Sequence, residues 1–279
     1  MRLYPSQRRR QILEEIRRAG AGSVTQLSNK FGVSAATIRR DLRVLEARGH
    51  LERTHGGAIT ERHIDNPPPI LAREVRKELR VSQKEQIARY IARELISNGD
   101  NIALGGGTTV GALIPLLAAK SDLTVVTNGL ATTSELHQAL RYRTDAHILC
   151  CGGILRLVSS TFVGPVAEQF FRGLHVNKLF LSATGLTLDT GVTDPDMLET
   201  QVKRAMIASA DKVILVMDSS KLDVKSLITV LPVSGIDILV TDDDIPERYL
   251  EMLAAHDVDV HIAPPIGEPR SAGKVAAQT

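Results

Sequence analysis

Apolar residues recur every three or four positions in three segments near the start of the chain, and this spacing predicts three short helices. We expect the first from Ser6, as its cap, to about Arg18, the second over residues 24–31, and the third from Ser34 to Gly49. Gly32 supplies the left-handed backbone that a tight turn between the second and third helices requires. A helix, a glycine turn and a second helix form the arrangement that reads DNA.

The third predicted helix has a polar and basic face opposite its apolar stripe. Small side chains let a helix approach the major groove, and arginine can form forked hydrogen bonds with guanine or phosphate. The candidate DNA contacts on this helix are Ser34, which also serves as its N-cap, Ala36, Thr37, Arg39, Arg40 and Arg43. The alternative is a solvated basic face on an ordinary helix. The neighbouring segments must decide between this alternative and DNA binding.

Residues 51–60 alternate in polarity and contain a turn at Gly56-Gly57, so they predict a two-stranded wing. Arg53 and His55 on this wing are candidate contacts with phosphate or the minor groove. Three helices, a glycine turn and a basic hairpin together favour DNA binding over a merely solvated face.

This segment resembles the winged helix-turn-helix of the DeoR family of bacterial transcriptional regulators. The resemblance rests on Val33-Ser34, Thr37 to Leu42, Leu45-Glu46, Gly49 and Arg53 to Ala58. We expect Asp41 to pair with a neighbouring arginine, because an exposed carboxylate would repel DNA.

The proline run at residues 67–69 predicts a linker, because consecutive prolines favour an extended spacer. We therefore expect a DNA-binding domain at 1–63, a linker at 64–69, an effector-binding and oligomerisation domain at 70–263, and a disordered tail at 264–279. The larger domain should begin with an amphipathic helix over about 70–97, broken near Val81-Ser82. This helix could pack on its own domain or against a second subunit, and the pattern leaves both open.

From residue 101 the chain repeats the order strand, turn, helix. The expected strands are short and almost entirely apolar, which is typical of a parallel sheet that helices cover on both faces. They lie at residues 101–104, 123–126, 146–150, 178–182, 212–217 and 236–240. The predicted fold class is α/β, a small winged helix-turn-helix followed by a larger Rossmann-like domain with a mainly parallel sheet.

Ligands of open parallel sheets bind at the carboxyl ends of the strands, where this sequence places glycine and polar residues. Backbone N–H groups of a glycine turn can approach an anion, and threonine hydroxyls add donors. The candidate residues after the first three strands are Gly105, Gly106, Gly107, Thr108, Thr109, Thr127, Asn128, Gly152 and Gly153. Ordinary turn geometry is the alternative, and we favour phosphate binding because two polar strand ends should be neighbours.

Further candidates follow later strands. Asp194 is a candidate effector contact, Glu199 is a candidate carboxylate for sugar hydroxyls, and Lys203 and Lys221 are candidate cations for phosphate. The alternative for Glu199 and Lys203, four residues apart, is a solvated ion pair. The alternative for Lys221 is a helix-capping turn.

The second domain resembles the effector domain of DeoR-type regulators, which is related to ribose-5-phosphate isomerases and glucosamine-6-phosphate deaminases. The matching segments are 105–109, 127–128, 152–153, 191–194 with Lys203, and 218–221. The resemblance implies a repressor of a carbohydrate or polyol operon that a phosphorylated sugar releases from double-stranded operator DNA. It implies a homo-oligomer, a dimer or tetramer, and no cofactor.

A sugar-phosphate isomerase or deaminase with a DNA-binding appendage is the second hypothesis. Such an enzyme needs a general base near the sugar carbonyl, and related isomerases carry acidic residues after a central strand. The corresponding stretch here, residues 182–186, has none. We therefore expect no catalytic residues, and the eight histidines show no metal-ligand spacing.

Charge and composition agree with a two-part regulator. The first 66 residues carry 13 Lys and Arg against 7 Asp and Glu, and the remainder carries 21 against 25. Only the first part should therefore touch nucleic acid. Aromatic residues are only 3% of the chain, which argues against base stacking on single strands. The adjacent Cys150 and Cys151 are expected to be reduced, and no signal or membrane-spanning run appears, so we expect a cytoplasmic protein.

Overall fold

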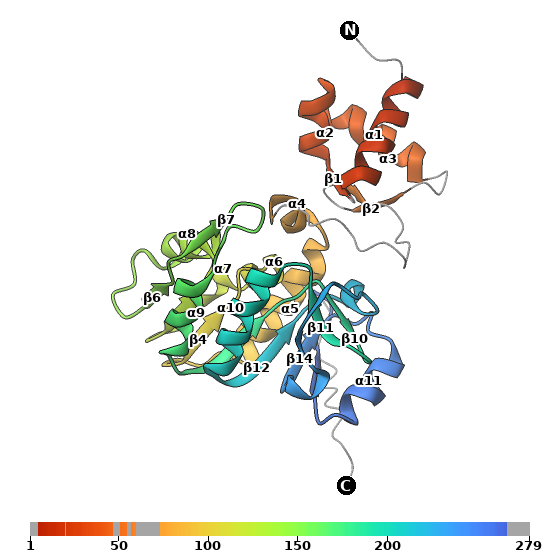
Figure 1. Ribbon diagram of the computed structural model, residues 1–279. Coiled ribbons are helices and arrows are strands. Elements are labelled where there is room, and N and C mark those ends of the chain that lie inside the picture. Colours follow the sequence, from red (N-terminus) through yellow and green to blue (C-terminus); the bar gives the residue numbers. More distant parts are fainter. Residues whose placement is uncertain (1–4, 20, 47–50, 55–56, 60–72, 267–279) are drawn as a thin grey trace. The chain divides into compact units, whose positions relative to one another are not determined.

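The computed structural model describes residues 5–19, 21–46, 51–54, 57–59 and 73–266 of the 279-residue chain. The chain divides into two compact units, residues 1–81 and 82–279, which are described separately below. Figure 1 gives the labels of the elements along the chain.

The first unit contains the three predicted helices around one apolar core. They are α1 (Pro5–Ala19), α2 (Val24–Phe31) and α3 (Ala35–Glu46). Their buried side chains are Ile12, Ile16, Val24, Leu27, Ile38, Leu42 and Leu45, joined by Leu51. The prediction that Ser6 caps the first helix was wrong, because α1 already begins at Pro5. Proline suits the first turn, where its fixed φ matches the helix and its missing N–H is not needed.

The turn between α2 and α3 has the predicted left-handed glycine. Gly32 has φ 61°, and the hydroxyl of Ser28 donates to the carbonyl of Val33 across the same turn. At the other end of α2, Ser23 and Gln26 form a reciprocal capping box. The short helix is therefore fixed at both ends by local hydrogen bonds.

The wing is a small antiparallel sheet of three strands rather than two. It contains β1 (Ala21–Ser23), β2 (Glu52–Thr54) and β3 (Gly57–Ile59) in the order β1-β3-β2. A Cβ atom on Gly57 would lie 2.2 Å from the carbonyl oxygen of Gly22, so the close approach of β1 and β3 requires glycine. The predicted pairing of two strands is confirmed, but Gly57, which was expected in the turn, is the first residue of β3 and pairs with Thr54. Strand β1 is an addition that its three-residue sequence does not reveal.

The amphipathic segment expected over 70–97 forms two helices. They are α4 (Arg73–Glu78), in the first unit, and α5 (Val81–Glu94), most of which belongs to the second. Arg80 separates them with a left-handed backbone, φ 51°, which ends the helical path. The predicted linker at 64–69 lies outside the described residues, as does the predicted tail from residue 267 onward.

The second unit is built on a sheet of seven strands, and every pair of adjacent strands in it is parallel. In spatial order the strands are β15 (Asp259–Ile262), β14 (Ile238–Thr241), β12 (Ala210–Val216), β9 (Val176–Leu181), β4 (Asn101–Leu104), β5 (Thr124–Thr127) and β6 (His147–Cys150). Successive strands run outward from β4 on one side and from β9 on the other. The order therefore reverses between β4 and β9, and ligands of such sheets bind at that reversal.

Helices cover both faces of this sheet, as the apolar strands predicted. The helices are α6 (Thr108–Gly111), α7 (Ile114–Leu117), α8 (Leu130–Leu140), α9 (Pro165–Arg172), α10 (Met197–Ala208) and α11 (Glu247–Ala254). Alternate residues of one strand enter different cores, since Leu179 and Leu181 pack with α9 and α10 while Phe180 packs with α5 and α8. Both faces of the central strands are therefore buried.

Two smaller sheets lie beyond the main one and were not predicted. One is a hairpin of β7 (Ile154–Arg156) and β8 (Thr161–Val163). The other joins β10 (Gly185–Thr187), β11 (Gly191–Asp194) and β13 (Ile228–Leu231). The two short 3₁₀ helices are η1 (Ser219–Lys221) and η2 (Val233–Gly235). These additions contribute side chains to the strand ends discussed next.

Candidate DNA-binding and effector sites

The recognition face of α3 presents its arginines to solvent. Arg39, Arg40 and Arg43 are exposed, while Ile38 and Leu42 on the opposite side are fully buried. Ser34 and Ala36 are also exposed, and Thr37 is half-buried. A helix with one buried stripe and three exposed arginines can enter a groove without losing its own packing.

Ser34 fixes the start of this face. The backbone N–H of Thr37 donates to Ser34 Oγ at 3.3 Å, and the two hydroxyls lie 3.0 Å apart. The predicted N-cap is therefore present. Of the two candidate wing residues, Arg53 lies in β2 but its side chain is outside the described atoms, and His55 lies outside the described residues.

Asp41 lies on α3 but faces inward, as expected for a structural carboxylate. It is 4% exposed, it accepts a hydrogen bond from Arg8 Nε at 2.7 Å, and Arg9 Nε lies 3.8 Å away. This buried pair ties α1 to α3 and keeps the Asp41 carboxylate away from the recognition face. The prediction that Asp41 pairs with an arginine is confirmed.

In the second unit, the turn after β4 passes close to the end of β9. The N–H of Gly105 donates to the carbonyl of Phe180 at 3.0 Å. A Cβ atom on Gly107 would lie 1.7 Å from Ser182 Oγ, and one on Gly106 would lie 2.3 Å from the methyl carbon of Thr161. A side chain at either position would therefore displace Ser182 Oγ or the methyl group of Thr161. Thr108 and the buried Thr109 follow at the start of α6.

The end of β5 lies beside this turn. Thr127 Oγ1 donates to the carbonyl of Leu104 at 2.7 Å, which ties β5 to β4. Asn128 is only 5% exposed, and its amide Nδ2 donates to the carbonyl of Phe162 at 3.3 Å. Its Oδ1 atom is buried and accepts no hydrogen bond from the part of the chain that the structure describes. A buried acceptor without a donor is costly, so this atom points to a ligand or water at the strand ends.

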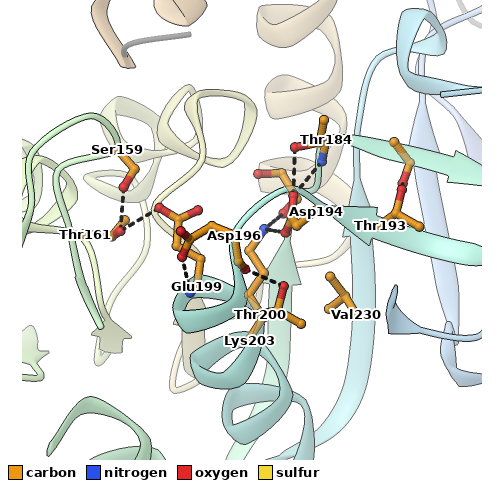
Figure 2. Close-up of polar contacts among 12 residues, drawn as sticks. Ser159, Thr161, Thr184, Thr193, Asp194, Asp196, Glu199, Thr200, Lys203 and Val230 are labelled. Atoms are coloured by element: carbon orange, nitrogen blue, oxygen red, sulfur yellow. Dashed lines mark hydrogen bonds and ion pairs between the residues drawn. The ribbon is translucent and has the colours of Figure 1, made fainter. Parts of the chain in front are cut away.

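Asp194 and Lys203 form a buried ion pair at the end of β9 (Figure 2). Lys203 Nζ contacts Asp194 Oδ2 and donates to the carbonyl of Ser182 at 2.7 Å. The other oxygen of Asp194 accepts from Thr184 N at 2.9 Å and from Thr184 Oγ1 at 2.8 Å. Asp194 is 3% exposed, and the Lys203 side chain is 16% exposed. The two predicted site residues meet, but each is engaged with the other.

Glu199 has partners of its own, on the β7–β8 hairpin. Arg156 Nη1 lies 2.7 Å from Asp196 Oδ2, and its Nε lies 3.1 Å from Glu199 Oε1. Thr161 Oγ1 donates to the same Glu199 oxygen at 3.3 Å (Figure 2). The alternative of a solvated pair between Glu199 and Lys203 was therefore wrong. The sequence analysis missed Arg156 and Thr161, which contact Glu199, and Thr184, which contacts Asp194. No local sequence pattern predicts contacts between residues that lie far apart along the chain.

Two of the remaining candidates, Gly153 and Lys221, have structural explanations. Gly153 has φ 129°, and a Cβ there would lie 2.7 Å from the carbonyl of Val163, so it closes the start of the hairpin. A Cβ on Gly152 would meet no atom within 4 Å. Lys221 ends η1, which the side chain of Asp218 caps, so the capping turn given as its alternative is present.

Within the described residues, no group of three or more metal-binding side chains occurs. None of the described helices is long and apolar enough to span a membrane. Cys150 and Cys151 are free thiols, and burial raises the pKa of Cys151 to about 12.

Comparison with known proteins decides the family. A model of the DeoR-like helix-turn-helix domain matches residues 8–63, and one of the DeoR C-terminal sensor domain matches residues 79–243. This chain belongs to the DeoR family. Among its relatives, a putative aga operon transcriptional repressor of Escherichia coli O157:H7 is 34% identical over 91% of this chain and 93% of the relative. The glycerol-3-phosphate regulon repressor of Escherichia coli K12 is 30% identical over 92% of this chain and 98% of the relative.

The resemblance noted from the sequence is thus confirmed, and so is the fold class of a helix-turn-helix unit followed by a parallel α/β unit. A solved ribose 5-phosphate isomerase from Plasmodium falciparum shows 12% identity and a TM-score of 0.37. That match covers 50% of this DeoR-family chain and 52% of the isomerase. The names of the DeoR-family relatives are those of transcriptional regulators, which agrees with regulation rather than catalysis.

Proposed function

We propose that this DeoR-family regulator is a repressor that binds operator DNA through α3 and is released by a phosphorylated sugar or polyol. The observation that carries the DNA half is the exposure of Arg39, Arg40 and Arg43 on a helix whose opposite side is fully buried. Arginine contributes both phosphate contacts and forked hydrogen bonds to guanine, so one helix face supplies affinity and specificity. Operator affinity should fall steeply with salt, because phosphate contacts release counterions.

The effector half is supported by the strand ends at the reversal between β4 and β9. Gly106 and Gly107 have no room for a side chain, and Asn128 Oδ1 is a buried acceptor whose donor is not among the described groups. Phosphate would lie against the backbone of the Gly105–Thr109 turn, and Asn128 would accept from a hydroxyl. The name of one relative refers to glycerol 3-phosphate, a polyol phosphate, and supports this class of effector.

The two halves are coupled by thermodynamic linkage. A homo-oligomer, dimer or tetramer, places two copies of α3 on a repeated or palindromic operator. The effector binds better to a conformer whose recognition helices are wrongly spaced. A coupling free energy of about 1–3 kcal/mol would weaken operator binding roughly 5- to 150-fold.

The proposed function does not include catalysis. A general base for isomerisation needs a free carboxylate, and both oxygens of Asp194 are already engaged by Thr184 and Lys203. Glu199 is paired with Arg156. Turnover of an aldose or ketose phosphate by the purified protein would favour the isomerase hypothesis instead.

The effector proposal is tested by thermal unfolding of the full-length protein. A panel of sugar and polyol phosphates is compared with the unphosphorylated parents, with inorganic phosphate as a further sample. Stabilisation by one phosphate ester and not by its parent supports the proposal, because a ligand of the native state raises the melting temperature. If no phosphorylated compound stabilises the protein, the effector proposal fails while the DNA-binding proposal stands.

A further inference from the structure

A cluster that joins the β7–β8 hairpin to α10 lies at the edge of the proposed effector site. The methyl group of Thr161 occupies the space beside Gly106, and the hydroxyl of Thr161 reaches Glu199. Arg156 lies directly opposite Thr161 in the hairpin, so both side chains share one face. A continuous set of contacts therefore runs from the glycine turn to the Arg156 guanidinium.

The cations near this site are already neutralised. The cluster contains three carboxylates, on Asp194, Asp196 and Glu199, against two cations, on Lys203 and Arg156. A phosphate dianion placed here would face an excess of negative charge. Moving Lys203 to it would also strand the buried carboxylate of Asp194, which is strongly unfavourable.

A hydroxyl group suits the same cluster better than an anion. Within the described structure, Arg156 Nε is buried and donates no hydrogen bond, although Glu199 Oε1 lies 3.1 Å away. Asn128 Oδ1 is likewise buried, and it accepts no hydrogen bond from the described residues. Arg156 Nε, although ion-paired with Glu199, and Asn128 Oδ1 thus lack a partner with hydrogen-bond geometry among the described residues, and a hydroxyl both donates and accepts.

We propose that Arg156 and Glu199 form the subsite that recognises adjacent hydroxyl groups of the effector, and that Arg156 determines the selectivity for them. The inference rests on the proposed effector function and deepens it. The guanidinium donates to one hydroxyl oxygen, and the carboxylate of Glu199 accepts from its neighbour. Lys203 is a positioning residue that holds Asp194 and the end of β9, and the phosphate lies toward the glycine turn. Sites built around a substrate hydroxyl discriminate strongly against analogues that lack it.

The test measures binding to the full-length protein by calorimetry. The probes are D-ribose 5-phosphate, D-glucose 6-phosphate and glycerol 3-phosphate, each paired with the analogue that lacks one hydroxyl of its diol, and inorganic phosphate alone. The wild-type protein should prefer one hydroxylated compound over its analogue by about 10- to 100-fold, as expected for hydrogen bonds to charged groups.

Two variants then test whether Arg156 and Glu199 recognise the hydroxyl groups of the effector. Arg156→Lys keeps the charge but loses the planar fork, so the preference should fall to about threefold or less with inorganic phosphate affinity unchanged. Glu199→Gln should also lose the preference, while inorganic phosphate binds equally or more tightly because one negative charge has gone. The matched control is Arg172→Lys on α9, whose exposed pair with Glu168 spans 3.0 Å and should leave binding unaltered.

The outcomes distinguish failure of the hydroxyl subsite from failure of the proposed effector function. If the wild-type protein binds no phosphorylated probe, the effector function and the hydroxyl subsite are rejected together. If it binds both members of each pair equally, only the hydroxyl subsite is rejected. Retention of the full preference in both Arg156→Lys and Glu199→Gln would likewise overturn it.

Discussion

Each unit contains a buried ion pair, but the two units differ in whether their other cationic side chains are exposed to solvent. In the first unit Asp41 is buried against Arg8, and Arg39 and Arg40 are exposed at the surface. In the second unit Asp194 is buried against Lys203, and the nearby cation Arg156 is also turned toward carboxylates. The first arrangement suits a polyanion such as DNA, and the second suits a small ligand that is recognised through hydroxyl groups.

The largest expected effects come from removing the buried carboxylate in either unit. Asp41→Ala would leave Arg8 buried without its partner, and Asp194→Ala would do the same to Lys203. Each change should lower the free energy of unfolding of its own unit by about 3–5 kcal/mol. Chemical denaturation of the full-length variants, with probes for each unit, measures this.

Exposed pairs supply the controls for these two variants. Glu14 pairs with Arg10 at 3.2 Å on α1, and Asp189 pairs with Lys225 at 3.4 Å, in both cases at the surface. Glu14→Ala and Asp189→Ala should therefore change stability little. Equal losses in the buried and exposed variants would mean that neither buried pair is structural.

The next largest effect concerns the recognition face. Arg39→Ala and Arg40→Ala should each weaken specific operator binding by about 1–3 kcal/mol, because each can remove a forked contact with a base. Circular dichroism should show an unchanged fold, since both side chains are exposed. Fluorescence anisotropy with labelled operator measures the loss.

Arg10→Ala is the matched control for these arginines. It removes an exposed arginine from α1, outside the recognition face. Wild-type operator affinity in both the Arg39 and the Arg40 variant would refute the assignment of α3 as the recognition helix.

A substitution in the glycine turn after β4 tests the role of the second unit. The Cβ of Gly107→Ala would lie 1.7 Å from Ser182 Oγ and 3.1 Å from Ser182 Cβ, so the Ser182 hydroxyl must rotate away or the turn must shift. We expect a cost of about 1–3 kcal/mol in stability, typical of overpacking, and loss of the response to effector with DNA binding retained. Gly173→Ala is the control, because its nearest atom, the carbonyl oxygen of Phe170, would lie 3.7 Å away. A normal effector response in Gly107→Ala would show that the turn is only structural.

The smallest expected effect concerns the adjacent thiols. Only thiolate reacts with alkylating reagents, and burial raises the pKa of Cys151 to about 12, so Cys151 is almost fully protonated at pH 8. Mass spectrometry after alkylation at pH 8 should find Cys150 modified, Cys151 unmodified, and both modified in denaturant. Rapid labelling of Cys151 in the native protein would contradict its burial.

Local signals explain what the sequence could predict. The spacing of Ile38, Leu42 and Leu45, the cap at Ser34 and the glycine at position 32 are all encoded within a few residues, and the structure has each of them. The apolar strands predicted the parallel sheet for the same reason, because both faces of the central strands are buried.

Partners that lie far apart along the chain explain what the sequence could not predict. Glu199 and Lys203 are neighbours on α10, and the sequence left open whether they bind the effector or pair with each other. In the structure the first turns to Arg156 and Thr161 on a hairpin, and the second turns to Asp194 on β11. The hairpin strands contain only three residues each, too few for a recognisable alternation.

The most direct test of the account is operator binding by the full-length protein with and without a stabilising sugar phosphate. Labelled DNA from the region upstream of its own gene is titrated at constant ionic strength, with the unphosphorylated parent as control. The account predicts that the phosphorylated compound raises the dissociation constant about 5- to 150-fold and that the parent does not. An unchanged dissociation constant, with the phosphorylated compound bound, would contradict the claim that the second unit controls the first.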